Sequence, residues 1–108
     1  MIGIKVKEFE HWNTYYSTTF YNEVEFDKTP LQVYVKVEPY SWFDYECEKI
    51  YIFDEVPNIW YFKKSYGGNG IRIIDKKLSI NELEDYGIKI LSKEEIEEEL
   101  KNGNWETS

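Results

Sequence analysis

The chain has very few of the residues on which disulfide or metal chemistry is built. Cys47 is the only cysteine and His11 the only histidine among 108 residues. A single thiol cannot form an internal disulfide, which suits a reducing compartment. One cysteine and one histidine cannot supply the usual ligands of a zinc site, and no calcium-loop pattern is present. We therefore expect no disulfide, no metal and no other cofactor.

Long apolar runs and alanine are also missing. No stretch approaches the roughly 18 apolar residues that a membrane-spanning helix needs, and residues 1–7 show no secretory pattern. We expect a cytoplasmic protein that does not contact membranes. Aromatic residues make up 19% of the chain, and aromatic side chains fit the pleated, half-buried surface of a sheet. The length suits one domain, residues 1–108.

Acidic residues outnumber basic ones, 21 against 13, which gives a formal net charge of −8. A surface this negative repels phosphate backbones, so we expect no direct binding to nucleic acids. It attracts basic surfaces, including the nucleic-acid-binding faces of other proteins. The alternative is that the charge only keeps a small domain soluble.

Period-two alternation of apolar residues predicts strands in the first 75 residues. Turn residues separate these strands, and the glycines of segment 67–70 predict a hairpin. The expected strands are 2–9, 14–26, 31–38, 49–53, 59–64 and 70–74, with turns at 27–30 and 56–58 and a break at 39–42.

The period changes to about 3.6 residues after residue 75, which predicts helices. Two serines, Ser79 and Ser92, are each followed three residues later by glutamate, which is a capping box. Glycines at 87 and 103 mark the two helix ends, and segment 88–91 between the helices resembles a short edge strand. The prediction is an α+β fold, in which a mostly antiparallel twisted sheet of about five to six strands carries two short C-terminal helices.

Catalytic motifs are weak. A nucleophile–histidine–acid site would have to use His11, and Cys47 lies among carboxylates that raise the pKa of a thiol. The glycines of 67–70 are not followed by the lysine and hydroxyl residue of a phosphate loop. We therefore expect no catalytic residues. An enzyme that uses carboxylates, with His11 or a tyrosine as proton shuttle, stays as an alternative.

Segment 38–55 interleaves six carboxylates and one lysine with aromatic residues. Carboxylates steer and pair with lysine and arginine, while tyrosine and tryptophan anchor an interface. The alternative is that the aromatic residues form core and the acids a solvated rim. We predict a partner-binding patch made of Tyr40, Trp42, Asp44, Tyr45, Glu46, Glu48, Asp54 and Glu55. The glutamates of the helix at 94–99 form a second acidic surface, for which a purely solvated face is again the alternative.

In size, charge and aromatic content the chain resembles small inhibitors that phages and plasmids make against host nucleases and defence systems. It is similar in composition to the immunity proteins that neutralise nuclease toxins. The resemblance implies a non-catalytic inhibitor that mimics nucleic acid and occupies a basic protein surface, in the host cytoplasm if phage-encoded. The alternative is a structural or regulatory module that self-associates, for example through the strand edge at 88–91.

Overall fold

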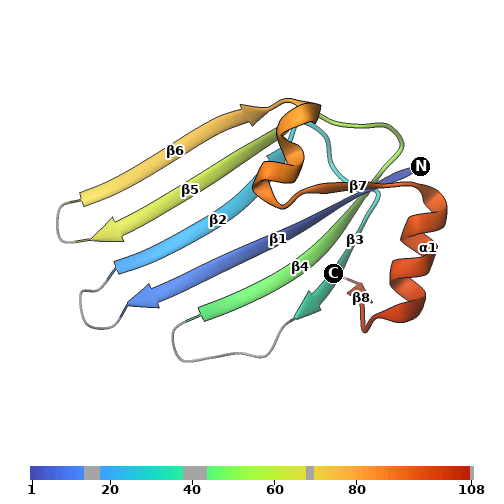
Figure 1. Ribbon diagram of the computed structural model, residues 1–108, viewed down its shortest axis with the longest axis horizontal. Coiled ribbons are helices and arrows are strands. Elements are labelled where there is room, and N and C mark those ends of the chain that lie inside the picture. The colour runs from blue at the N-terminus through green and yellow to red at the C-terminus, as the bar shows by residue number, and fades with distance from the viewer. Residues whose placement is uncertain (14–17, 38–43, 68–69, 108) are drawn as a thin grey trace.

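The computed structural model describes the backbone of residues 1–13, 18–37, 44–67 and 70–107, and within these the side chains outside 9–22, 37–46 and 63–74. The fold is α+β, as the sequence predicts (Figure 1). In chain order the elements are β1 (Ile2–Asn13), β2 (Thr18–Phe26), β3 (Gln32–Val37), β4 (Asp44–Phe53), β5 (Ile59–Gly67), β6 (Gly70–Leu78), the 3-10 helix η1 (Ile80–Tyr86), β7 (Lys89–Leu91), α1 (Lys93–Asn102) and β8 (Glu106–Thr107).

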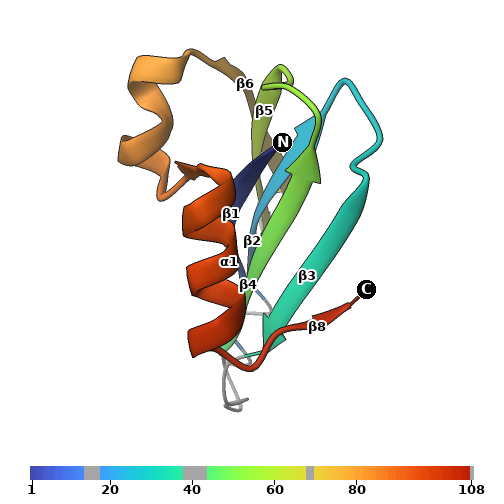
Figure 2. The same cartoon turned by 90° about the vertical axis from the view of Figure 1, so that its right-hand side faces the viewer.

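Every pair of neighbouring strands is antiparallel among the described residues. The order across the sheet is β6-β5-β2-β1-β4-β3-β8, and β7 pairs with β1 beside this path. Both helices lie on the same side of the sheet and near one end of it (Figures 1 and 2).

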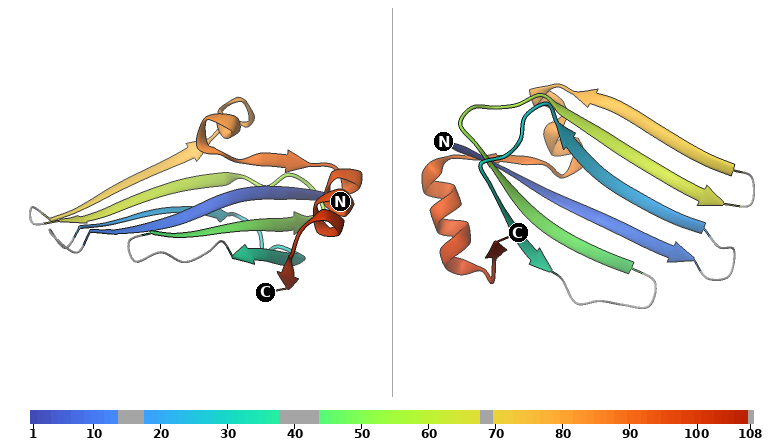
Figure 3. Two further views of the ribbon diagram at one scale, coloured as in Figure 1. Left: turned by 60° about the horizontal axis from the view of Figure 1, so that its bottom comes forward. Right: turned by 180° about the vertical axis from the view of Figure 1, so that it is seen from behind.

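The sheet divides at β1 and β2. These strands pair only where residues 9–13 meet residues 18–22, while Gly3–Lys5 of β1 pairs with β7 instead. Toward the end that carries the helices, the sheet therefore separates into two groups of strands. One group consists of β2, β5 and β6, and the other of β7, β1, β4 and β3. The edge-on view in Figure 3 shows this twisted arrangement.

The main hydrophobic core fills the space between the diverging strands. Its buried members come from β1, β4, β5, β6 and the segment around η1: Ile4, Val6, Phe53, Ile59, Leu78, Leu83 and Ile88. From β2, the ring of Phe26 meets the edges of Tyr51 and Phe53 with centroids 4.8 and 4.9 Å apart. Aromatic contacts across the division thus hold the two groups of strands together.

A second, smaller core lies under α1 and consists of Ile50, Ile52, Leu91 and Ile96. The helix approaches β1 closely at Gly3, where an added Cβ would lie 2.9 Å from Cγ1 of Ile96. A residue without a side chain is required there for the helix to sit this near the strand.

The caps are as the sequence predicts. The carboxylate of Glu82 accepts hydrogen bonds from the N–H and hydroxyl of Ser79 at 3.1 and 3.0 Å, and Ser92 and Glu95 form the second capping box. Gly87 is left-handed, with φ 70°. Two details differ: the first helix is 3-10, and Gly103 is extended, with φ −128°.

Several strands are longer than the alternation suggested. β1 continues to Asn13, β4 begins at Asp44 instead of 49, and β6 continues to Leu78. Pairing explains the difference, because β4 follows β1 without a bulge from Ile2 opposite Phe53 to His11 opposite Asp44. The expected break at 39–42 and the first residues of the expected strand 14–26 lie outside the described residues.

A candidate protein-binding end

Two turns meet at the end of the sheet that also carries the helices. Phe26, at the end of β2, is opposite Ile59 of β5, and Ile59 is opposite Leu78 of β6. The N–H of Leu31 donates to the carbonyl of Ile52 at 2.8 Å, and Ile2 is opposite Phe53. We call this surface the turn end, and define it as Met1, residues 27–31, residues 54–58 and Ile80.

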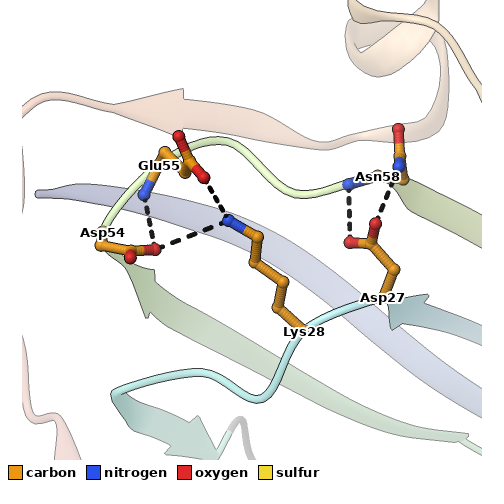
Figure 4. Close-up of polar contacts among 5 residues, drawn as sticks. All are labelled: Asp27, Lys28, Asp54, Glu55 and Asn58. Atoms are coloured by element: carbon orange, nitrogen blue, oxygen red, sulfur yellow. Dashed lines mark hydrogen bonds and ion pairs between the residues drawn. The ribbon is translucent and has the colours of Figure 1, made fainter.

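A lysine links the two turns (Figure 4). The Nζ of Lys28 lies 2.8 Å from Oε1 of Glu55 and 3.7 Å from Oδ1 of Asp54. The same oxygen of Asp54 accepts the backbone N–H of Glu55 at 2.9 Å. The hydrogen bond from Lys28 to Glu55 raises the pKa of the lysine, which favours its charged form.

Asp27 makes the second link between the turns. Its carboxylate accepts the backbone N–H of Asn58 at 3.0 Å and the side-chain amide of Asn58 at 2.7 Å (Figure 4). The amide hydrogen bond lowers the pKa of Asp27. The turns are therefore fixed relative to one another by the ion pair of Lys28 with Glu55 and by the hydrogen bonds of Asp27 with Asn58.

The turn end is acidic after this pairing. In its two turns, Asp27, Asp54 and Glu55 outnumber Lys28. The side chains of Asp54 and Glu55 are 75% and 76% exposed, whereas that of Lys28 is 35% exposed. The carboxylates thus face solvent, while the cation that partly neutralises them lies closer to the protein.

Two hollows lie beside the turns. One, of about 320 Å³, has a mixed lining of Val56, Pro57, Asn58, Ile59, Lys77, Leu78, Ser79, Ile80 and Leu83. The other, of about 220 Å³, is mainly apolar and is lined by Met1, Leu31, Gln32, Tyr34, Ile52, Lys93, Ile96 and Glu97.

The large apolar side chains that are exposed in the described part of the chain all lie at these two hollows: Met1, Leu31, Val56 and Ile80. Scattered exposed apolar residues are ordinary on a protein surface, whereas gathered ones mark interaction sites. Apolar contacts beside charged groups are typical of interfaces.

The structure divides the predicted patch. Tyr40 and Trp42 lie outside the described residues. Asp44, Tyr45 and Glu46 begin β4, and only their backbone is described; Glu48 is half-buried in the same strand. Asp54 and Glu55 follow the other end of β4, so a strand roughly 30 Å long separates the two groups.

The sequence reasoning missed the remaining residues of the turn end. It predicted both turns from their Asp, Pro and Asn residues, yet assigned them no role. The available signal was the pair of apolar residues, Leu31 and Val56, each next to a turn proline. Such residues are unusual in turns that polar groups dominate.

A separate polar cluster lies on β1 and β4. The carboxylate of Glu8 accepts hydrogen bonds from Nζ of Lys49 at 2.9 Å and from the hydroxyl of Tyr51 at 2.8 Å. Burial, and then the negative charge of Glu8, raise the pKa of Tyr51, so the phenol stays protonated and donates. The cluster joins the two strands.

The glutamates of α1 are partly engaged within the protein. Glu99 pairs with Lys5 at 2.9 Å, and Glu95 caps the helix and lies 3.7 Å from Lys89. Glu94 and Glu98 are exposed, and the latter accepts a hydrogen bond from Asn102. None of the large exposed apolar side chains of the described residues belongs to this second acidic surface, whereas all four belong to the turn end.

Within the described residues, no three His, Cys, Asp or Glu side chains are grouped to hold a metal ion, and no helix is long and apolar enough to cross a membrane. No family model matches the sequence, and comparisons with curated proteins and with solved structures found no match.

Proposed function

We propose that this protein binds a basic surface of a partner protein through its turn end and acts as a stoichiometric inhibitor of that partner. The observation that carries the proposal is the combination of exposed carboxylates at Asp54 and Glu55 with exposed apolar side chains at Leu31 and Val56 in the same two turns. A partner that offers lysine or arginine between two apolar side chains matches this arrangement in charge and in shape.

The net charge of −8 supports the same partner class. Long-range attraction speeds association with a basic protein, and the contacts at the turn end then determine how long the complex lasts. Nucleic-acid-binding proteins, nucleases among them, carry basic faces of this kind. A protein that covers such a face blocks access of nucleic acid without any catalysis.

The test is capture from a bacterial lysate at low and high salt, with the tagged protein as bait and bound proteins identified by mass spectrometry. The double variant Asp54→Asn, Glu55→Gln removes two charges but keeps the oxygen acceptors that hold the turn. The expected result is a basic protein that the unmodified chain retains at low salt, releases at high salt and binds roughly tenfold more tightly than the variant does.

The matched control is Glu94→Gln, Glu98→Gln on α1, which removes the same charge from exposed positions elsewhere. Binding to the control should change little beyond the general effect of net charge. Equal losses for the two double variants would show that net charge alone drives capture and would refute the role of the turn end.

Apolar contact is tested separately with Leu31→Ser and Val56→Ser. These side chains are 65% and 42% exposed, so the protein should keep its stability within roughly 1 kcal/mol. Binding to the captured partner should weaken, because an apolar side chain that becomes buried at an interface contributes to affinity. Unchanged affinity for both variants would exclude the hollows from the interface.

A further inference from the structure

Strand β6 forms an open edge of the sheet. It stands at the end of the strand order, and no described strand lies on its outer side (Figure 1). At the opposite edge, β8 pairs with Tyr34 and Val35 of β3. The other edge strand, β7, has three residues, whereas β6 has nine. Most strands in globular proteins are shorter than β6.

The usual protections of an edge strand are largely missing from β6. It contains no proline, and its pairing with β5 runs from Ile59 opposite Leu78 to Gly67 opposite Gly70 without a bulge. Charge is the one protection that it has, since Asp75, Lys76 and Lys77 are exposed. Lysines on an edge strand repel other basic strands, but they do not keep an acidic strand from pairing with that edge.

The register identifies the backbone groups that this edge offers. Two residues separate Gly67 from Gly70, and the closing pair of such a hairpin exchanges both backbone hydrogen bonds. Bonded and non-bonded pairs then alternate along an antiparallel ladder. The N–H and C=O groups that point away from β5 are therefore those of Ile71, Ile73, Asp75 and Lys77.

The charge of this hairpin is opposite to that of the whole protein. Residues 59–78 hold five basic residues and one acidic residue, whereas the rest of the chain holds eight basic and twenty acidic residues. Three of the four charged residues of β6 are basic, so most registers of two copies side by side bring basic residues near one another, which disfavours pairing of the strand with itself. An acidic strand would meet opposite charges along the same edge.

From this geometry and charge we propose that β6 binds an extended acidic segment of another protein, which adds to the sheet as a further strand. Backbone hydrogen bonds would give the affinity, and the excess of basic residues in the hairpin would select acidic sequences. The two surfaces meet at Lys77, which also lines the hollow beside Val56 and Ile80. The outward groups of residues 71–75 lie farther along β6 and prefer the opposite charge, so the protein would bring two partners together.

The probe is a fluorescein-labelled ten-residue peptide in which glutamate alternates with valine, and fluorescence anisotropy measures its binding to the full chain. A serine–valine peptide of the same length, which carries no charged side chains, is the charge control. The acidic peptide should bind at least roughly tenfold more tightly than the neutral one. Equal or tighter binding of the neutral peptide would overturn the proposal.

Asp75 offers a matched pair of variants, because its side chain is exposed and its N–H points outward. Asp75→Pro removes that N–H without breaking a hydrogen bond to β5. Asp75→Thr removes the same negative charge as the proline variant but keeps the N–H. The proline variant should bind the acidic peptide roughly tenfold more weakly than the threonine variant. Equal affinities would refute strand addition.

Hydrogen exchange of the unmodified protein, followed by NMR, tests the same point without any substitution. Adding the acidic peptide should slow exchange at Ile71, Ile73, Asp75 and Lys77 and leave the alternate amides unchanged. Protection elsewhere, or the same protection on raising the protein concentration without peptide, would contradict the proposal. A turn-end variant that no longer captures the basic partner should still show this protection by the acidic peptide. The two proposals are therefore tested independently.

Discussion

Replacement of Gly3 by alanine should loosen the contact between α1 and β1. The new Cβ would lie 2.9 and 3.0 Å from Cγ1 and Cδ1 of Ile96 and 3.1 Å from Cγ2 of Ile50. Carbon atoms in contact normally stay about 3.5–4.0 Å apart, so the side chain of Ile96 has to shift by about half an ångström or more. Overpacking of this kind costs about 1–3 kcal/mol. Alanine also stiffens the unfolded chain, which offsets up to about 1 kcal/mol of that cost.

The partner substitution is Ile96→Ala, which by itself leaves a cavity. Ile96 is only 7% exposed, and truncation of a buried isoleucine costs about 2–5 kcal/mol. In this background the alanine at position 3 loses two of its three close contacts and fills part of the cavity. The double variant should therefore be more stable than the sum of the single effects predicts, by about 1–2 kcal/mol.

The assay is equilibrium unfolding in urea of the unmodified protein, both single variants and the double variant, followed by circular dichroism. The coupling energy is the difference between the double variant and the sum of the single variants. Additivity within about 0.3 kcal/mol would refute the reasoning, because it would mean that Gly3 and Ile96 are not in contact.

Three further predictions concern the caps. The hydrogen bond with Lys76 lowers the pKa of Glu82 from 4.5 to about 2, so Glu82→Gln should lower stability at pH 7. This difference should vanish as the pH falls from about 4.5 to about 2, because the stabilisation by a depressed carboxyl is lost on protonation; urea titrations across that range measure it. Gly87→Ala should cost about 1–2 kcal/mol in urea unfolding from left-handed strain alone, because an added Cβ meets nothing within 4 Å. Ser92→Ala should cost about 1 kcal/mol and speed amide exchange in the first turn of α1, since its hydroxyl accepts the N–H of Glu95 at 3.3 Å.

Local chemistry explains why the C-terminal elements could be predicted closely. A capping box and a left-handed glycine act within a few residues, so the sequence around Ser79 and Gly87 is enough to define η1. Whether one short turn becomes 3-10 or α depends on how it packs, and the sequence pattern does not contain that information.

Strand lengths and the division of the sheet depend on contacts between distant residues. The pairing of β4 with β1 extends β4 back to Asp44, and the place where β7 replaces β2 beside β1 follows from packing across the sheet. For the same reason the predicted patch could not be assembled from one segment. Lys28 and Glu55 are 27 residues apart, and only the fold brings the two turns together.

The measurement that tests the central proposal most directly is a map of amide chemical shifts and exchange rates in the complex with the captured basic partner. We predict changes concentrated at residues 27–31, at residues 54–58 and near Met1, Ile80 and Ile96, with Glu98 and Asn102 of α1 unaffected. A footprint centred on Glu98 and Asn102, or one confined to Asp44–Glu48 at the other end of β4, would contradict the assignment of the interface to the turn end.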